Sequence, residues 1–504
     1  MKRIALSGFL AFLVFSLLIS CGSTKLTSSE YLDCLDAGDY APCIEYLEEK
    51  NEKSNDDRIR DNFDLAMMKH FQKDYDSSLL VLNSTDRLME DAVTESLTKG
   101  LAAMFMNDNA AEYKGTPYEY IYINIFNALN YYNKGNIEEA AVEVRRLNEK
   151  QRKYLNEYGE WLKADGSTDL EISSTYKMLN LDSNPLFENT PAKPKDSDIF
   201  RDSATARYLS IIFAMMDDSV NNSWNISADT RTFKALNPSF DIDSLTAISD
   251  GKGRLDIIAF SGLIGRRGER RVMIGPFPGI QFPVNGHFVY IPPFDLEFVY
   301  PEFPAPQTEL RPIVAPVVGW GPSFTIYPGK NEITKMPNNQ VDSVRLVFDS
   351  KDFSKQINLS LLEDYNYAVR QDVNSKARKA YSRSVKRSML KKFTAVAGAT
   401  AGLLAAENAV QQDENLLTVA TYAAIYLSAA KAIDQVDKTE TADIRQVYAL
   451  PAQAYASGVE LPPGKYSFKV QYLSKKGVII KEEYFSDIEV KEGKTVLVES
   501  SCQK

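Results

Sequence analysis

The sequence predicts an α+β protein, with an array of helical hairpins first and antiparallel β structure after it. Three observations carry this prediction. A hairpin motif recurs within residues 21–165, β-branched and aromatic residues punctuated by Gly and Pro fill residues 246–372, and apolar and polar residues alternate in the C-terminal stretch 441–504. With 504 residues, 44% of them hydrophobic, the chain is long enough to bury more than one core.

Residues 1–20 have the three parts of an export signal. Lys2-Arg3 supplies a positive start, and the apolar run that follows is too short for a good membrane-spanning helix. The run ends in Leu18-Ile19-Ser20-Cys21, which resembles the lipobox of bacterial lipoproteins, where the cysteine thiol receives a diacylglycerol. We therefore expect a lipoprotein signal peptide and lipidation of Cys21. The alternatives are an ordinary signal peptide or an uncleaved helix.

A lipid on Cys21 implies a lipid-anchored place in the cell envelope. Each buried methylene of the acyl chains contributes roughly 0.8 kcal/mol, so two or three chains make a stable anchor. Gly22 stands where an aspartate would favour retention in the inner membrane, which indicates the outer membrane of a diderm bacterium. The net charge of −10 disfavours general binding to nucleic acid.

The remaining cysteines are Cys34, Cys43 and Cys502. An exported chain meets oxidising conditions, so Cys34 and Cys43 are either joined by a disulfide or buried as two small hydrophobic residues. With only His70 and His287 beside them, the cysteines form no zinc-binding pattern. We expect no metal and no cofactor.

Residues 21–165 are expected to form TPR-like helical repeats. Stretches beginning at Ala37, Gln72 and Asn133 share a polar turn, then a small residue, then an apolar residue one helical turn later. A small residue there lets two antiparallel helices approach closely, and the apolar residue packs across the pair. The aligned residues are Asp39, Asp74 and Asn136 in the turn, Cys43, Ser78 and Ala140 at the crossing, and Leu47, Leu82 and Val144 beyond it. The pattern resembles the second half of the tetratricopeptide repeat; the alternative is a helical bundle without repeats.

A stacked array of such hairpins forms a superhelix whose concave face is a binding surface. Tyr118, Tyr122 and Tyr132, with Arg145 and Arg146, are the candidate partner-binding residues of this groove. Because Tyr118 and Tyr122 are four residues apart, they share one helical face, which is either the groove or simply core.

Residues 166–198 are polar and contain prolines, which predicts a linker loop, and residues 199–240 are predicted to form a further helical hairpin. Residues 246–372 are predicted to form a central antiparallel β-domain. Within it, the stretch "IGRRGERR" places four arginines in an expected hairpin turn: Arg266, Arg267, Arg270 and Arg271. Such a turn either binds an anion, such as a phosphate or a lipid headgroup, or is a solvated loop tip.

Residues 373–437 are predicted to form a basic helix followed by an apolar helical hairpin. The hairpin is either buried or is a membrane-inserting or oligomerising pair. Alternation in "KYSFKVQYL" and the strands after it predicts a small β-sandwich-like module at 441–504, similar to PEGA-type domains.

Taken in order, these segments resemble an uncharacterised family of bacterial envelope lipoproteins with TPR-like N-terminal helical repeats and C-terminal β-modules. The residues that carry the resemblance are the lipobox at Cys21, "ALNYYNKGNIEEAAVEVRRLNEKQ", "SRSVKRSMLKK" and "ADIRQVYALPAQAYASGVELPPGKY". The last of these departs from the family pattern at Gln446-Val447-Tyr448, where a small residue and an aromatic residue are expected. The resemblance implies architecture and location and no particular chemistry.

Nucleophile elbows, phosphate loops and dinucleotide fingerprints are absent from the sequence, so we assign no catalytic residue. We expect a non-enzymatic scaffold that reaches the membrane through its N-terminal lipid and binds other envelope proteins through its repeats. One alternative is a cell-wall-directed enzyme or glycan-binding protein with its site in the central β-domain. Another is a membrane-inserting secretion or pore component. The sequence does not predict an oligomeric state.

Overall fold

The structure, a computed structural model, describes most of the chain between residues 28 and 504. The predicted signal peptide, Cys21, most of the predicted linker and the stretch 411–440 lie outside the described residues. The described ranges are 28–53, 57–96, 113–158, 191–193, the single residues 195, 197 and 200, and then 202–216, 222–243, 248–277, 280–284, 287–291, 294–303, 313–315, 324–328, 336–349, 353–410 and 441–504.

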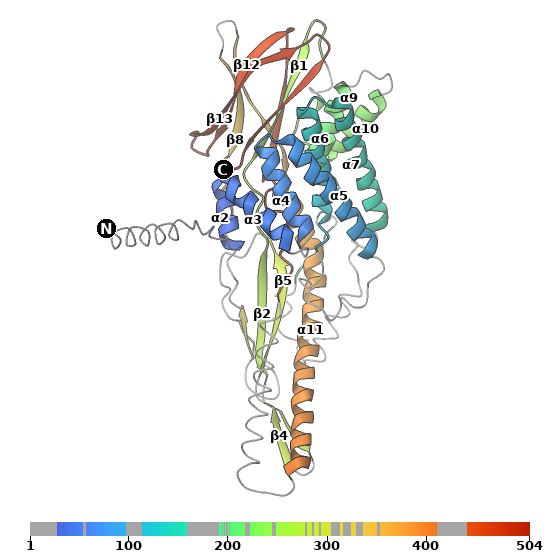
Figure 1. The fold of residues 1–504 in the computed structure, drawn as a ribbon, viewed down its shortest axis with the longest axis vertical. Helices are drawn as coiled ribbons and strands as arrows, with labels where there is room; N and C mark the ends of the chain where they lie inside the picture. Colours follow the sequence, from blue (N-terminus) through green and yellow to red (C-terminus); the bar gives the residue numbers. More distant parts are fainter. Residues whose placement is uncertain are drawn as a thin grey trace, which may run out of the picture.

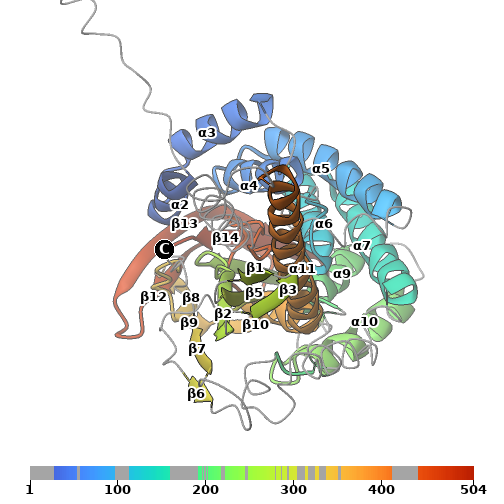
Figure 2. The same ribbon diagram turned by 90° about the horizontal axis from the view of Figure 1, so that it is seen from below.

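The N-terminal part is an array of helices in which each helix packs against the next one in the chain. Seen from below, the helices follow an arc around the strands (Figure 2). Their bounds are α2 (Ser28–Ala37), α3 (Tyr40–Lys53), α4 (Arg58–Phe71), α5 (Tyr75–Ser96), α6 (Pro117–Asn133), α7 (Ile137–Tyr158), α9 (Ala204–Met216) and α10 (Asn222–Leu236). Contacts between successive neighbours are typical of a stacked array of hairpins.

The three turns aligned in the sequence have the same backbone geometry. Gly38, Lys73 and Gly135 occupy the same place in them and have positive φ angles of 73°, 64° and 85°. In each turn, the N–H of this residue bonds the carbonyl three residues back and the next N–H bonds the carbonyl five back, at 2.8–3.1 Å. The small residues at the crossings, Cys43, Ser78 and Ala140, are fully buried. The three stretches are therefore hairpins of one kind.

The β structure of the body is a sandwich of two four-stranded sheets. One has the order β10-β11-β1-β14 and the other β13-β12-β8-β9. The strands are β1 (Gly253–Ser261), β8 (Ser343–Asp349), β9 (Ser354–Asn358), β10 (Ser360–Asp364), β11 (Gln453–Leu461), β12 (Gly464–Leu473), β13 (Ile479–Val490) and β14 (Thr495–Cys502). Strand β1 pairs antiparallel with β11 and parallel with β14.

The predicted separation into a central β-domain and a C-terminal β-module is wrong, because each of the two sheets contains strands from both stretches. The physical reason lies in β1, whose nine residues are all buried. Leu255 and Ile257 face the core between the two sheets, whereas Ile258 and Phe260 face the helices. A strand that is buried on both faces needs a layer on each side. The second sheet, which includes the C-terminal strands β12 and β13, supplies one layer, and the helical array supplies the other.

A narrow extension projects from the body (Figure 1). It contains a sheet of order β5-β2-β7-β6, the hairpin β3-β4 and the long helix α11. The strands are β2 (Gly268–Phe277), β3 (Ile280–Val284), β4 (His287–Ile291), β5 (Phe294–Glu302), β6 (Ile313–Ala315) and β7 (Phe324–Pro328). Helix α11 (Tyr365–Val410) packs along β5, and its Ser384 hydroxyl accepts a hydrogen bond from the Val299 N–H at 2.8 Å. The helix therefore covers the β5 edge of this sheet.

The boundary predicted at residue 373 is also wrong. Helix α11 begins at Tyr365 and continues for 46 residues, so the basic helix and the first apolar run are one element. Nothing in the run from 365 to 410 ends a helix, since it contains no proline. The second arm of the predicted apolar hairpin lies outside the described residues. The fold as a whole is α+β.

Candidate functional site

The inner face of the helical array, where the sequence places a binding groove, is filled by the chain itself. Helices α4, α6 and α9 form this face, since α6 contacts both of the others and α9 contacts strands β10 and β14. The arc of helices encloses β1, β14 and the start of α11 (Figure 2). The side chains that meet there form one continuous core with the helices.

Tyr118 and Tyr122 belong to this core and not to an open groove, which corrects their assignment as partner-binding residues. Both side chains are fully buried. The Tyr122 ring stacks on Tyr365 with 4.3 Å between ring centroids, and its hydroxyl donates to Glu363 at 2.9 Å. The Tyr118 hydroxyl accepts a hydrogen bond from the Arg267 guanidinium at 3.2 Å. The sequence allowed this helical face to be either a binding groove or core, and in the structure it is core.

The other three candidate groove residues lie apart from these two. The half-buried Tyr132 hydroxyl donates to the Leu497 carbonyl at 3.1 Å and accepts from its N–H at 2.9 Å, so it joins the end of α6 to β14. Arg145 and Arg146 are exposed on α7, where Arg146 pairs with Glu143 at 3.1 Å. The five predicted residues therefore do not form one surface.

An extended segment, residues 442–452, runs along the inner face and is held there by buried carboxylates. Asp64 of α4 accepts hydrogen bonds from the backbone N–H groups of Tyr448 and Ala449, both at 2.7 Å. Glu119 of α6 accepts one from the Val447 N–H at 2.8 Å. Both acidic residues are buried. A peptide backbone whose N–H groups point at a helix face needs acceptors on that face, and these two side chains supply them.

The electrostatics of Asp64 follow from its burial. Desolvation raises the pKa of this carboxyl to about 7, against the lowering effect of the Ala449 N–H and the Arg60 guanidinium. The Tyr31 hydroxyl also donates to Asp64, at 3.0 Å. The carboxyl thus receives several donors, all from the same chain.

Two further carboxyls, those of the half-buried Glu363 and the buried Asp256, are occupied in the same way. Glu363 accepts from the Ser203 hydroxyl at 2.6 Å and from the Thr205 N–H at 2.8 Å, at the start of α9, and burial raises its pKa. Asp256 on β1 pairs with Arg254 at 3.0 Å, and burial raises its pKa to about 7. Each carboxyl therefore has a structural role that the geometry accounts for.

The pair of Arg254 and Asp256 depends on a glycine opposite it. Gly458 of β11 is the partner of Asp256 in the strand register. A Cβ atom on Gly458 would lie 2.0 Å from a guanidinium nitrogen of Arg254 and 2.1 Å from a carboxylate oxygen of Asp256. Glycine is required there because the ion pair occupies the space of a side chain.

The predicted anion-binding turn is wrong. Its arginines lie before and within β2, and Arg266 and Arg267 are buried. Each guanidinium pairs with carboxylates of this chain, which leaves no uncompensated positive charge for a phosphate. The pairs are Arg266 with Asp36, Arg267 with Asp372 at 2.9 Å, Arg270 with Glu302 at 2.5 Å, and Arg271 with Glu297 at 2.5 Å and Glu269 at 2.7 Å.

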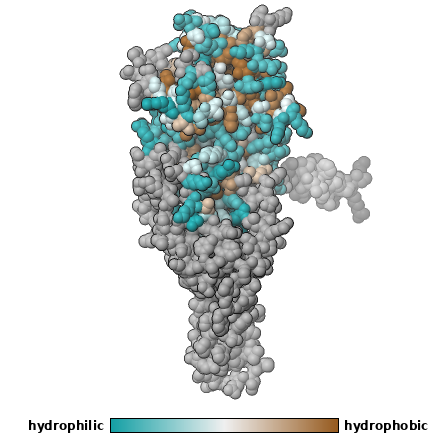
Figure 3. Space-filling model, turned by 180° about the vertical axis from the view of Figure 1, so that it is seen from behind, coloured by the Kyte–Doolittle hydropathy of each residue, from teal (hydrophilic) through white to brown (hydrophobic). Residues whose placement is uncertain are grey.

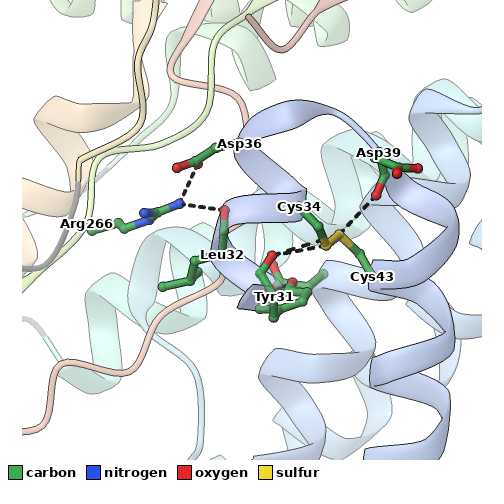
Figure 4. Close-up of a disulfide and its surroundings, with 8 residues drawn as sticks. Tyr31, Leu32, Cys34, Asp36, Asp39, Cys43 and Arg266 are labelled. Carbon is green, nitrogen blue, oxygen red and sulfur yellow. Dashed lines mark hydrogen bonds and ion pairs between the residues drawn. A yellow bond between two sulfur atoms is a disulfide. The ribbon is translucent and has the colours of Figure 1, made fainter. Parts of the chain in front are cut away.

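The sulfurs of Cys34 and Cys43 form a disulfide between α2 and α3. This decides between the two alternatives for these cysteines. Figure 4 shows the disulfide beside the contact between Arg266 and α2, where the guanidinium also donates to the Leu32 carbonyl at 3.4 Å. The first helical hairpin is thus closed covalently and tied to the base of the extension.

Sequence reasoning missed the role of the buried acids. Asp64 and Glu119 stand within the apolar faces of α4 and α6, and a carboxylate on such a face needs donors from a packed neighbour. That signal predicts a polar contact on the inner face. It does not identify the segment that supplies the donors.

Among the residues that the structure describes, no three His, Cys, Asp or Glu side chains are grouped so as to hold a metal ion. In the same part of the chain, no helix has both the length and the apolar character needed to cross a membrane. The described surface seen from behind carries hydrophilic and hydrophobic residues side by side (Figure 3). Comparison with protein-family models, with curated proteins and with solved structures found no match to this chain.

Proposed function

We propose that the chain is an exported lipoprotein, anchored by Cys21 in the outer membrane of a diderm bacterium, that acts as a non-enzymatic scaffold for other envelope proteins. Its helical array is proposed to be TPR-like. The export proposal is supported by the disulfide between Cys34 and Cys43, because disulfides persist in oxidising compartments and are rare in the cytosol.

The observation that carries the scaffold proposal is the contrast between the two sides of the array. The inner side is buried against the sheet, whereas the outer helices present apolar and basic side chains to solvent. Leu80 on α5 is 76% exposed and Val142 on α7 is 42% exposed. Val142, Arg145 and Arg146 are three and four residues apart, so they share one face of α7. We propose that a partner docks on this outer face.

The repeated hairpin geometry supports the TPR-like assignment. The three matching turns and the buried small residues after them are what a repeat of two antiparallel helices requires. An array of this kind usually binds partners on its concave side. In this chain that side is occupied by residues 442–452 and the sheet, which favours the outer face for a partner.

The proposal is tested by crosslinking in intact cells followed by purification of the tagged chain. The double variant Arg145→Glu/Arg146→Glu reverses two charges on the outer face and is expected to lose specific envelope partners. The matched control, Lys475→Glu/Lys476→Glu, makes the same charge change at the exposed turn between β12 and β13 and is expected to keep them. Equal partner recovery with both variants would contradict docking on α7.

The anchor is tested separately by fractionation. The wild-type chain is expected in the outer-membrane fraction and the Cys21→Ala variant in a soluble periplasmic fraction. A Cys21→Ala chain that stays with the membrane would contradict a lipid anchor. Recovery of glycan fragments in place of proteins would favour the glycan-binding alternative over the scaffold.

A further inference from the structure

His70 lies at the junction of the helical array and the sheet. It is in the last turn of α4, and its side chain is 1% exposed. Its Nδ1 is 2.7 Å from the Oδ1 of Asn130 on α6, and its Nε2 is 2.6 Å from a carboxylate oxygen of Glu499 on β14. The side chain therefore bridges two helices and a strand that is distant in sequence.

The orientation of the Asn130 amide is fixed by its other partner. The Ser78 hydroxyl donates its one proton to the Ala66 carbonyl at 2.8 Å. It must therefore accept at its contact with the Asn130 Nδ2, at 2.9 Å. This leaves the Asn130 oxygen facing His70. Both ring nitrogens of His70 then face acceptors, and only an imidazolium, which carries a proton on each nitrogen, satisfies both.

We propose that His70 is a protonation-dependent latch, which as an imidazolium holds the helical array against β14 through Glu499 and loosens this contact when it loses its proton. Glu499 is itself held in place, since its second oxygen accepts from the Asn133 amide at 2.6 Å. The inference goes beyond the scaffold proposal and does not depend on the lipid anchor.

The groups around His70 determine whether its protonation raises or lowers the stability of the fold. The rings of Phe71, Tyr75 and Phe126 surround the imidazole, with centroids 5.2–5.8 Å from its own. Beyond Tyr75, Lys73 pairs with Glu483 of β13 at 2.7 Å, so that lysine has a carboxylate partner of its own.

Burial lowers the pKa of His70, but Glu499 and the hydrogen bond that the ring donates to Asn130 outweigh it and hold the pKa above its ordinary value of 6.5. A raised pKa in the folded state gives stability that is present below pH 6.5 and is lost as the pH rises through the folded value.

The test uses the fact that the chain has two histidines. In the full-length His287→Gln variant, the imidazole resonances in a ¹H–¹⁵N NMR titration come from His70 alone. They are expected to titrate above pH 6.5 and to move to lower pH in the added presence of Glu499→Gln. If His287→Gln does not fold, the His70 signals are assigned in the wild type as those missing from His70→Gln.

The effect of His70 on the contact between the array and β14 is measured by thermal unfolding from pH 6 to pH 9. The melting temperature of the wild type is expected to fall more across this range than that of His70→Gln, which has no proton to lose at this position. A control, Lys73→Met, removes the neighbouring ion pair and is expected to keep the wild-type slope. Titration of His70 at or below pH 6.5, or equal slopes for the wild type and His70→Gln, would overturn the proposal.

Discussion

The two faces of β1 are packed in different ways. On the face toward the second sheet, Leu255, Ile257 and Ala259 meet the apolar side chains of β8 and β12. On the face toward the helices, the apolar Ile258 and Phe260 lie on the same side as Asp256. This carboxylate pairs with Arg254 and contacts the Tyr208 hydroxyl. One strand thus takes part in an apolar interface and in a mixed polar and apolar interface.

The same contrast extends to the whole molecule. The core between the sheets is built from apolar side chains such as Leu346, Phe468 and Val470. The contact between the array and the rest also has an apolar core, and to it are added the acidic residues Asp64, Glu119 and Glu363 and the pair of His70 and Glu499. Apolar burial is non-directional and changes little with pH. Buried acids and their donors fix one orientation and respond to protonation. We infer that the polar contacts fix how the array sits on the sheet, in addition to the apolar core that the two share, whereas the side chains between the two sheets contribute mainly through apolar burial.

The largest effect is expected from Asp64→Ala. The substitution leaves the N–H groups of Tyr448 and Ala449 and the Tyr31 hydroxyl without their acceptor in a buried place. Unsatisfied buried donors each cost about 1–3 kcal/mol, so we expect a loss of about 5 kcal/mol in the free energy of unfolding, measured with urea.

The conservative Asp64→Asn variant keeps an oxygen toward the two N–H groups and is expected to lose less. Because burial raises the pKa of Asp64 to about 7, the wild type binds a proton on folding and loses stability as pH rises from about 4 to 7. Asp64→Asn is expected to remove this slope. A loss of under 1 kcal/mol for Asp64→Ala, on the scale of an ordinary surface substitution, would contradict the role of this carboxyl in holding residues 448 and 449 on the array.

A smaller and different effect is expected on the other face of β1. Ile257 is fully buried between the sheets, and Ile257→Ala is expected to cost about 3 kcal/mol through lost burial and the cavity left behind. The side chains packed in this core are apolar or, like Tyr455 and Tyr472, have a pKa raised above the ordinary value for tyrosine, so the loss should be the same at pH 6 and pH 8. Urea unfolding at the two pH values measures this. A loss that changed with pH would show that the sandwich also senses protonation.

The sequence predicts the local elements well and the contacts between distant ones poorly. The turns at Asp39, Asp74 and Asn136 are recognisable because polar residues and a small crossing residue are local signals. The parallel pairing of β1 with β14 joins residue 254 to residue 495, and no local pattern specifies it. For this reason the sequence predicts strands in both stretches but assigns them to separate modules, whereas they share two sheets.

The candidate site shows the same limit. Tyr118 and Tyr122 were predicted to share a helical face, and both lie in one buried cluster. Whether that face is free depends on Tyr365 and residues 442–452, which are far away in the sequence. The arginines at 266–271 appear uncompensated in sequence because their partners, Asp36, Asp372 and Glu302, come from three other segments.

The smallest effect tests the contact between the array and β13. Lys73 holds a left-handed conformation, with φ of 64°, at the place where the other two turns have glycine. That conformation costs a non-glycine residue roughly 1–2 kcal/mol, whereas glycine adds backbone entropy to the unfolded chain. In the ion pair of Lys73 with Glu483, the lysine side chain is 60% exposed, so solvent screens the pair and it contributes little. Lys73→Gly is therefore expected to raise the free energy of unfolding by about 0.5–1 kcal/mol, measured with urea.

The matched reverse change is Gly135→Lys. Gly135 has the same left-handed backbone and open space where a Cβ would lie, so the substitution tests backbone strain without a clash. We expect it to lower the free energy of unfolding by about 1 kcal/mol. If Lys73→Gly is instead destabilising while Gly135→Lys behaves as expected, the contact of Lys73 with Glu483 outweighs the strain. The array would then depend on charge at its edge as well as on the buried acids of its inner face.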